Sequence, residues 1–254
     1  MKYFVNKNSI VRRIWGKSDT ILFIFAGAAA EFALNKAVDW LYFTGRIPID
    51  PIGRLFSTVS YARAIIFSEK HAALHAIHAM TKIHTNVETK RGQKIPDVAY
   101  RDVLFMLIDY SIRSFELLER KLTHAEKNEV FLVFREVGNE MGVPGLPDTL
   151  EGFEMMRQIH LSENLQRSHY SRDLFRQYRK HLGRLRYNIL IETQILVVPM
   201  KVREKLGFRK RSLMRQLIAL YKWSRRIRMD GFVRELLLPE KYKKEIKALD
   251  LVGV

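Results

Sequence analysis

Apolar residues recur at helical spacing along nearly the whole chain, and this pattern constrains the fold more than any other feature. In the segment Val98–Leu122, for example, Leu104, Leu107, Ile108 and Ile112 share one helical face. No run of strand length alternates polar and apolar residues between turn residues. The sequence therefore predicts an all-α protein with about eight to ten helices. We expect a single domain over residues 1–254, with residues 1–17 as an N-terminal lead.

Turn and capping residues place the ends of the predicted helices. Pro51 suits a first helical position, Ser68 is a candidate cap, and Thr123 with Glu126 has the spacing of a capping box. Asp148 and Glu151 repeat this spacing after the break at Gly142–Pro147. The segments expected to be helical are Ser18–Tyr42, Pro51–Phe67, Glu69–Ile83, Val98–Leu122, one from Thr123 to near Gly138–Gly142, one after Asp148, Arg172–Leu182, Leu185–Val198 and Ser212–Arg228.

The most apolar stretch, Ile21–Leu41, resembles part of a signal peptide because it follows several basic residues. Three charged residues fall inside it, among them Glu31, and the uncharged part Ile21–Ala30 is too short to span a bilayer. We expect a buried helix of a cytoplasmic protein rather than a signal peptide.

Charge is concentrated in the last third of the chain. Of 44 Lys and Arg and 27 Asp and Glu, residues 165–254 hold 23 basic and 8 acidic ones. Such a positive field favours an anionic membrane surface, nucleic acid or acidic ligands. Basic helices are nevertheless most often solvated faces, and we expect peripheral membrane contact before nucleic acid.

Several classes of site are excluded by composition and motif. The chain has no cysteine, which excludes iron–sulfur clusters, zinc ribbons and thiolate-ligated haem. It also lacks a glycine-rich phosphate loop, a nucleophile elbow, an EF-hand and the paired ExxH motifs of a di-iron bundle. A metal or haem iron would have to be held by histidine or carboxylate.

Histidine is the residue type with the clearest pattern. His71, His75 and His78 share one helical face, a stripe that we interpret as solvent-exposed rather than as a metal cluster. His84 lies outside this stripe and at the predicted C-terminal end of its helix, where the helix dipole favours charged imidazole.

Arg54 and Thr58 lie four residues apart on the predicted helix Pro51–Phe67 and project from one face. Such a pair could hold an anionic group such as a propionate or phosphate, or it could be a solvated pair.

The order of these segments resembles the catalytic domain shared by latex clearing proteins, which are rubber oxygenases, and the MpaB-type oxygenase of mycophenolic acid biosynthesis. The resemblance extends over about Leu22–Ile246. It rests on DPIGRLFSTVSYARAIIFS (Asp50–Ser68), KIHTNVETKRG (Lys82–Gly92), REVGNEMGVPGLPDTLEGFEMM (Arg135–Met156) and the later VVPMKVREKLGF and LLLPEKY segments.

This resemblance implies a globin-like bundle that binds haem b, with His84 as the iron ligand and Arg54 and Thr58 in the haem pocket. It also implies dioxygen-dependent oxidation or cleavage of a carbon–carbon double bond in an apolar, prenyl-like substrate. The Lys that latex clearing proteins carry before the Thr is Ser57 here. The alternatives are a haem-binding protein without turnover and a non-enzymatic basic protein that binds membrane or nucleic acid.

Overall fold

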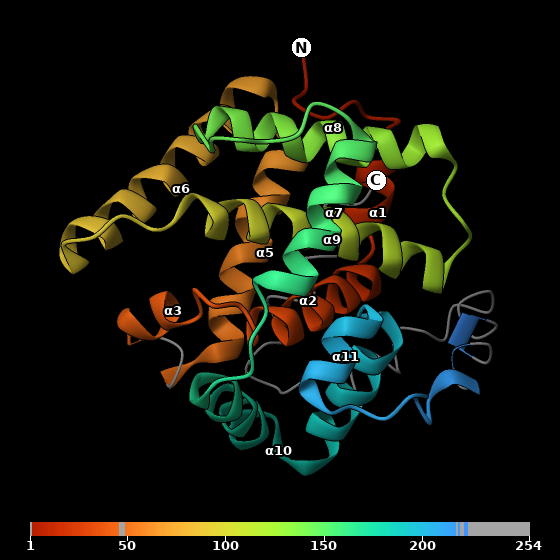
Figure 1. Cartoon of the computed structure of the whole chain (residues 1–254). Coiled ribbons are helices and arrows are strands. Elements are labelled where there is room, and N and C mark those ends of the chain that lie inside the picture. Colours follow the sequence, from red (N-terminus) through yellow and green to blue (C-terminus); the bar gives the residue numbers. More distant parts are fainter. Residues whose placement is uncertain (1, 46–48, 217, 219–220, 223–254) are drawn as a thin grey trace.

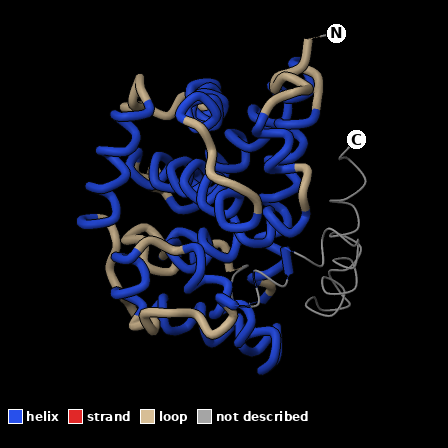
Figure 2. Tube along the Cα trace, turned by 90° about the vertical axis from the view of Figure 1, so that its right-hand side faces the viewer, coloured by secondary structure: helices blue, strands red, loops and turns tan. Residues whose placement is uncertain are grey.

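The computed structural model describes residues 2–45, 49–216, 218 and 221–222. All regular secondary structure in these residues is helical, with two isolated β-bridges, so the predicted all-α bundle is confirmed (Figures 1 and 2). The helices are α1 (Ile10–Trp15), α2 (Ser18–Phe32), α3 (Asp39–Phe43), α5 (Pro51–Phe67), α6 (Lys70–Arg91), α7 (Asp97–Leu118), α8 (His124–Glu140), α9 (Leu150–Glu163), α10 (His169–Val197) and α11 (Met200–Leu206).

Helix α2 lies at the centre of the bundle and packs against α7 and α10. Its apolar residues, such as Ile21 and Ile24, are almost fully buried in the main core. Gly27 allows the closest approach, because a Cβ atom there would lie 2.4 Å from the ring of Tyr110 on α7. The apolar stretch is thus a buried helix, as expected. No helix in the described part of the chain is long and apolar enough to cross a membrane.

The prediction of one helix over Ser18–Tyr42 is wrong, because α2 ends at Phe32 and α3 begins only at Asp39. The Asn35 side chain accepts a hydrogen bond from the amide of Ala37 at 2.8 Å. The connecting backbone also pairs with the segment after α9, where Lys36 donates to the Asn164 carbonyl at 3.1 Å. Local side-chain bonds and tertiary pairing therefore replace the helical hydrogen bonds here.

Helix α6 is longer than the predicted Glu69–Ile83 and ends at Arg91, followed by the capping residue Gly92, whose φ of 69° is left-handed. Its last turn is held by Arg91, which lies over the ring of Trp40 at 3.9 Å and pairs with Asp39 at 2.6 Å. His84 is consequently an interior residue of the helix, and its expected stabilisation by a helix C-terminus is wrong.

The predicted caps differ in outcome. Thr123 and Glu126 form the capping box of α8, as expected. The cap of α9 is Thr149, which accepts from the amide of Gly152, while Asp148 pairs with Arg135. One further cap also shifts by one residue, because Glu69 rather than Ser68 precedes α6, while α5 ends at Phe67 as predicted and Ser68 follows it.

The two helices predicted over Arg172–Leu182 and Leu185–Val198 are joined in α10. They meet at a kink at Gly183, where φ is 72°. Glycine is well suited to this left-handed conformation because it lacks a Cβ atom. The prediction Ser212–Arg228 lies largely outside the described residues.

We predict that Gly27→Ala destabilises the protein by about 1–3 kcal/mol, because the new methyl group would overlap the Tyr110 ring. The measurement is urea unfolding followed by circular dichroism. Gly152→Ala is the matched control, since its nearest neighbour is the Pro147 Cβ at 3.2 Å. The greater helix propensity of alanine should offset much of that smaller strain. Equal losses of stability in both variants would contradict the proposed α2–α7 contact.

Candidate functional site

Arg54 and Thr58 lie together near the start of α5, where the Asp50 side chain caps the helix by accepting from the amide of Gly53. The guanidinium of Arg54 donates through Nη1 to Thr58 Oγ1 at 3.0 Å and to Ser57 Oγ at 3.1 Å. Arg54 and Thr58 are half-buried and Ser57 is exposed. The structure thus brings the predicted pair into direct contact and holds the guanidinium along the helix.

His84 projects from α6 with its ring edge-on to Tyr100 at the start of α7, with the ring centroids 5.3 Å apart. Its Nδ1 atom is buried and has no hydrogen-bond partner among the residues that the structure describes. The neighbouring Tyr100 hydroxyl donates to Glu88 at 3.2 Å, and Glu88 also accepts from the backbone amide of Ile95. The imidazole therefore has one nitrogen that is shielded from water and not used by the protein.

The charge of Arg54 affects the pKa of His84. Burial lowers the pKa of His84 and the positive charge of Arg54 lowers it further, while Glu88 opposes both effects. The imidazole of His84 is thus favoured in its neutral form, which is the form that binds a metal ion. This outcome is the opposite of the charged histidine expected at a helix end.

The stripe of His71, His75 and His78 lies on the exposed face of α6, as predicted. The described ranges contain no group of three or more histidine, aspartate and glutamate side chains that could hold a metal ion by themselves.

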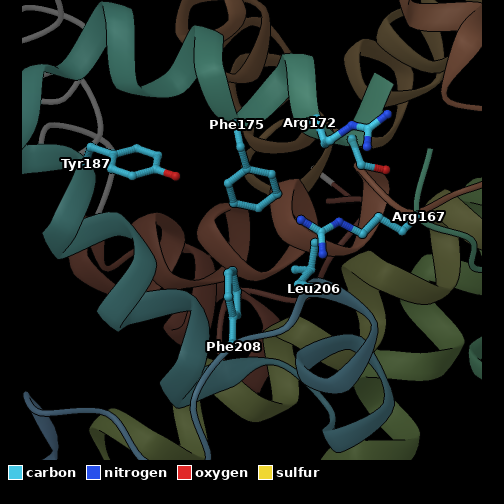
Figure 3. A pocket seen from close by; sticks show the side chains of 7 residues that line it. Arg167, Arg172, Phe175, Tyr187, Leu206 and Phe208 are labelled. Carbon is cyan, nitrogen blue, oxygen red and sulfur yellow. The ribbon is translucent and has the colours of Figure 1, made fainter. Parts of the chain in front are cut away.

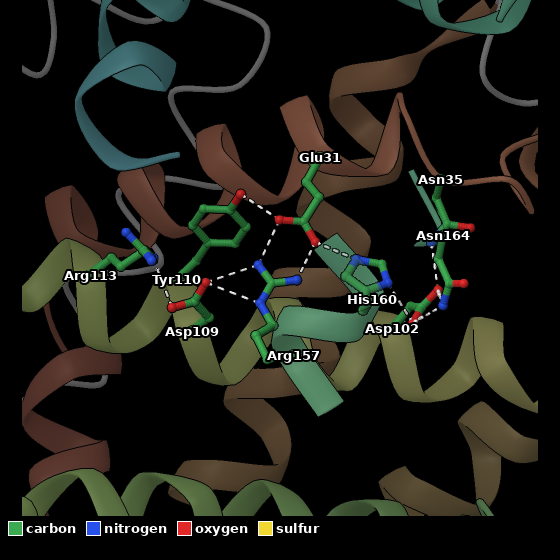
Figure 4. Close-up of polar contacts among 9 residues, drawn as sticks. All are labelled: Glu31, Asn35, Asp102, Asp109, Tyr110, Arg113, Arg157, His160 and Asn164. Atoms are coloured by element: carbon green, nitrogen blue, oxygen red, sulfur yellow. Dashed lines mark hydrogen bonds and ion pairs between the residues drawn. The ribbon is translucent and has the colours of Figure 1, made fainter. Parts of the chain in front are cut away.

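A second polar cluster, which the sequence analysis missed, lies within the core between α2, α7 and α9 (Figure 4). Glu31 on α2 is fully buried and forms a two-pronged ion pair with Arg157 on α9, one prong measuring 2.6 Å. The same carboxylate accepts from the Tyr110 hydroxyl at 2.8 Å and lies 2.8 Å from Nε2 of His160. One carboxylate thus contacts three side chains from two other helices.

The cluster continues along α7 in both directions (Figure 4). Asp109 Oδ2 accepts from Arg157 at 2.9 Å. Asp102 Oδ1 lies 2.7 Å from Nδ1 of His160, and its other oxygen accepts from Asn35 at 2.9 Å. We call Glu31, Asp102, Asp109, Tyr110, Arg157 and His160 the buried ion network.

The network shifts the pKa values of its members. Burial alone would raise the pKa of Glu31, but Arg157 and His160 outweigh it and hold this pKa at about 2. Burial would likewise lower the pKa of His160, yet hydrogen bonds to Asp102 and Glu31 raise it above the ordinary value. Glu31 is therefore ionised at neutral pH, and the charged form of His160 is stabilised.

The buried ion network is a structural tie rather than a reaction site. Glu31, Arg157 and His160 are 0, 3 and 2 % exposed, so no substrate reaches them in this conformation. Sequence reasoning noted Glu31 only as a charge inside an apolar helix. That position was itself a usable signal, because a buried carboxylate requires a cationic partner elsewhere in the chain.

The structure thus places a half-buried Arg54 and Thr58 on α5 within an all-α bundle, with His84 on α6 in the electrostatic range of Arg54. The sequence profile described as ER-bound oxygenase mpaB/B′/rubber oxygenase, catalytic domain, matches residues 12–229. The chain belongs to this oxygenase family, which confirms the resemblance. Membership implies a small-molecule substrate and dioxygen as co-substrate. No curated protein and no solved structure matches the chain.

We predict that His160 makes stability fall on the alkaline side. The pKa of His160 is higher in the folded than in the unfolded protein. Its contribution to the free energy of unfolding is therefore complete below pH 6.5 and is lost as the pH rises through the folded-state pKa. The contribution of Glu31 is complete above pH 4.5 and is lost as pH falls toward 2. The free energy of unfolding, measured by urea from pH 3 to 9, should show both declines.

The His160→Gln variant should lose the alkaline decline, because glutamine does not titrate. His71→Gln, a change of an exposed histidine on α6, is the matched control and should retain the wild-type profile. An unchanged alkaline decline in His160→Gln would show that another group is responsible.

Proposed function

We propose that the protein is a haem b-dependent oxygenase in which His84 is the axial ligand of the iron. The observation that supports this most directly is the buried, unpartnered Nδ1 of His84, in a ring that adjoins Tyr100 and lies within the electrostatic reach of Arg54. A buried ring nitrogen without a partner is costly, and such atoms are uncommon without a ligand or water. Family membership supports the oxygenase activity.

The donor set around His84 suits haem b better than the other forms of iron. The chain has no cysteine, so neither a thiolate-ligated haem nor an iron–sulfur cluster fits. The neutral form of His84 is favoured, as iron ligation requires. Bound haem would supply the one-electron and dioxygen chemistry that amino-acid side chains lack.

In this proposal Arg54 and Thr58 orient the reactants. Arg54 presents a guanidinium that is already fixed along α5 by its bonds to Thr58 and Ser57. From there it would donate hydrogen bonds to a haem propionate or to the oxygen reactant, and its fixed position would reduce the reorganisation needed during reaction. The substrate we propose is apolar and prenyl-like, and the reaction is oxidation or cleavage of its carbon–carbon double bond.

The alternative within the same fold is a haem-binding protein without turnover. Ser57, at the position of the Lys in latex clearing proteins, is an exposed hydroxyl engaged with Arg54 and provides no second cation. Oxygen uptake in the presence of a polyisoprenoid separates the two, because only an oxygenase consumes dioxygen in step with product.

We also propose peripheral contact with an anionic membrane through the basic C-terminal third. Within its described part, Leu185, Met200 and Leu213 are 69, 62 and 73 % exposed amid lysine and arginine residues. Exposed apolar side chains between cations are typical of surfaces that lie against a bilayer.

We predict that protein expressed with added haem shows a Soret absorption band, and that the band is lost or shifted in His84→Ala. His78→Ala removes an exposed histidine from the same helix and should leave the spectrum unchanged. Absence of the band in the parent protein would overturn the haem proposal. A spectrum unaltered by His84→Ala would overturn the choice of ligand.

We predict that the protein binds liposomes containing phosphatidylserine in low salt and is released as ionic strength rises, because screening weakens attraction between lipid and basic residues. Co-sedimentation at 50 and 500 mM salt measures this, with phosphatidylcholine liposomes as the control. Binding that is unchanged in high salt would contradict the membrane proposal.

A further inference from the structure

A separate pocket lies between the first half of α10, the region after its kink and the end of α11 (Figure 3). Its volume is about 220 Å³, and none of the proposed haem-site residues lines it. The lining residues are Arg167, Ser171, Arg172, Phe175, Tyr187, Leu206 and Phe208. The pocket thus combines two cations with a mostly aromatic wall.

Neither arginine is neutralised by a residue in the described part of the chain. Within that part, Arg167, which precedes α10, and Arg172 on α10 form no side-chain ion pair or hydrogen bond, whereas Arg176 on α10 lies 3.8 Å from Asp173. Figure 3 shows the guanidinium of Arg167 extending into the space near Phe175 and Leu206. Arginine binds carboxylate or phosphate oxygens through two parallel hydrogen bonds. Two uncompensated guanidinium groups match best the charge of a phosphate monoester, about −1.5 to −2 at pH 7.

The remaining walls are mostly apolar. Phe175 and Phe208 meet edge to face with their centroids 5.9 Å apart, and Leu206 is buried. Figure 3 shows the hydroxyl of Tyr187 directed toward Phe175. Burial raises the pKa of Tyr187, and Arg179 opposes this, so the phenol stays protonated and offers a hydrogen-bond donor. The pocket thus offers arginines to the polar end of a ligand and aromatic rings to an apolar end.

We propose that this pocket binds a phosphate monoester that carries a single apolar chain. The arginines would hold the phosphate, and the first part of the chain would lie against Phe175 and Phe208. Pockets for entire drug-sized ligands measure about 300–1,000 Å³, so this smaller one would take the head group and the start of the chain. The rest of the chain would extend out of the pocket. The proposal is independent of haem and of turnover.

The test is isothermal titration with octyl phosphate, octanol, octanoate and inorganic phosphate. Octyl phosphate should bind at one site, at least about tenfold more tightly than each of the others. Octanol has no charge, octanoate carries a single negative charge on a carboxylate, and inorganic phosphate has no apolar chain. Arg167→Gln and Arg172→Gln should each weaken octyl phosphate binding about tenfold or more. Phe208→Ala should reduce the preference for octyl over inorganic phosphate.

Arg176→Gln is the matched control, since it removes the same charge from α10 at a residue that does not line the pocket. It should leave the affinity within about twofold, and an equal loss there would overturn the proposal. Octanoate or inorganic phosphate binding as tightly as octyl phosphate would overturn the assigned chemistry. Competition by vesicles containing lysophosphatidate, a single-chain phosphate monoester, would identify a bilayer lipid as the source of the head group, and its absence a free amphiphile.

Discussion

The burial of the Glu31 carboxylate is the constraint on which the central packing depends. A carboxylate without water is stable only with close cations and donors, and Glu31 obtains them from Arg157, His160 and Tyr110. Breaking such a buried pair typically costs about 3–5 kcal/mol, so α9 cannot shift along α2 without a large penalty. The ion pair is directional, and it therefore fixes the register of these two helices.

Helix α7 connects the buried ion network with the proposed haem site. The helix that presents Tyr110, Asp109 and Asp102 to the buried ion network also presents Tyr100 to His84. The position of α7 is fixed further by the contact of Gly27 with Tyr110. About two turns further along α6, Arg91 anchors the end of the helix on α3. His84 thus lies on a helix that is held near its C-terminal end, as its proposed role as an axial ligand would require.

Local signals in the sequence were sufficient for much of the helical architecture and for part of the candidate site. The capping box of α8 and the first residue of α5 depend on neighbours in sequence, and both were predicted correctly. The end of α2 and the length of α6 were predicted wrongly, because pairing with Asn164 and stacking on Trp40 determine them. In the same way, the spacing of four residues identified the contact of Arg54 with Thr58. The pairing of Glu31 with Arg157 spans 126 residues and has no local signature.

The buried ion network and the surroundings of His84 differ in whether other protein groups form hydrogen bonds with the buried polar atoms. Both oxygens of Glu31 and all three guanidinium nitrogens of Arg157 have partners, so this cluster has little capacity left for a ligand. His84 Nδ1 is buried without any partner, although Glu88 lies one helical turn away and is committed to Tyr100 and Ile95. Evolution of a purely structural histidine would favour a bond at that nitrogen, because an unmade buried bond costs about 1–3 kcal/mol. If His84 binds the proposed haem iron, that ligation would offset this cost, which is why His84, and not the more elaborate network around His160, is the residue to test first.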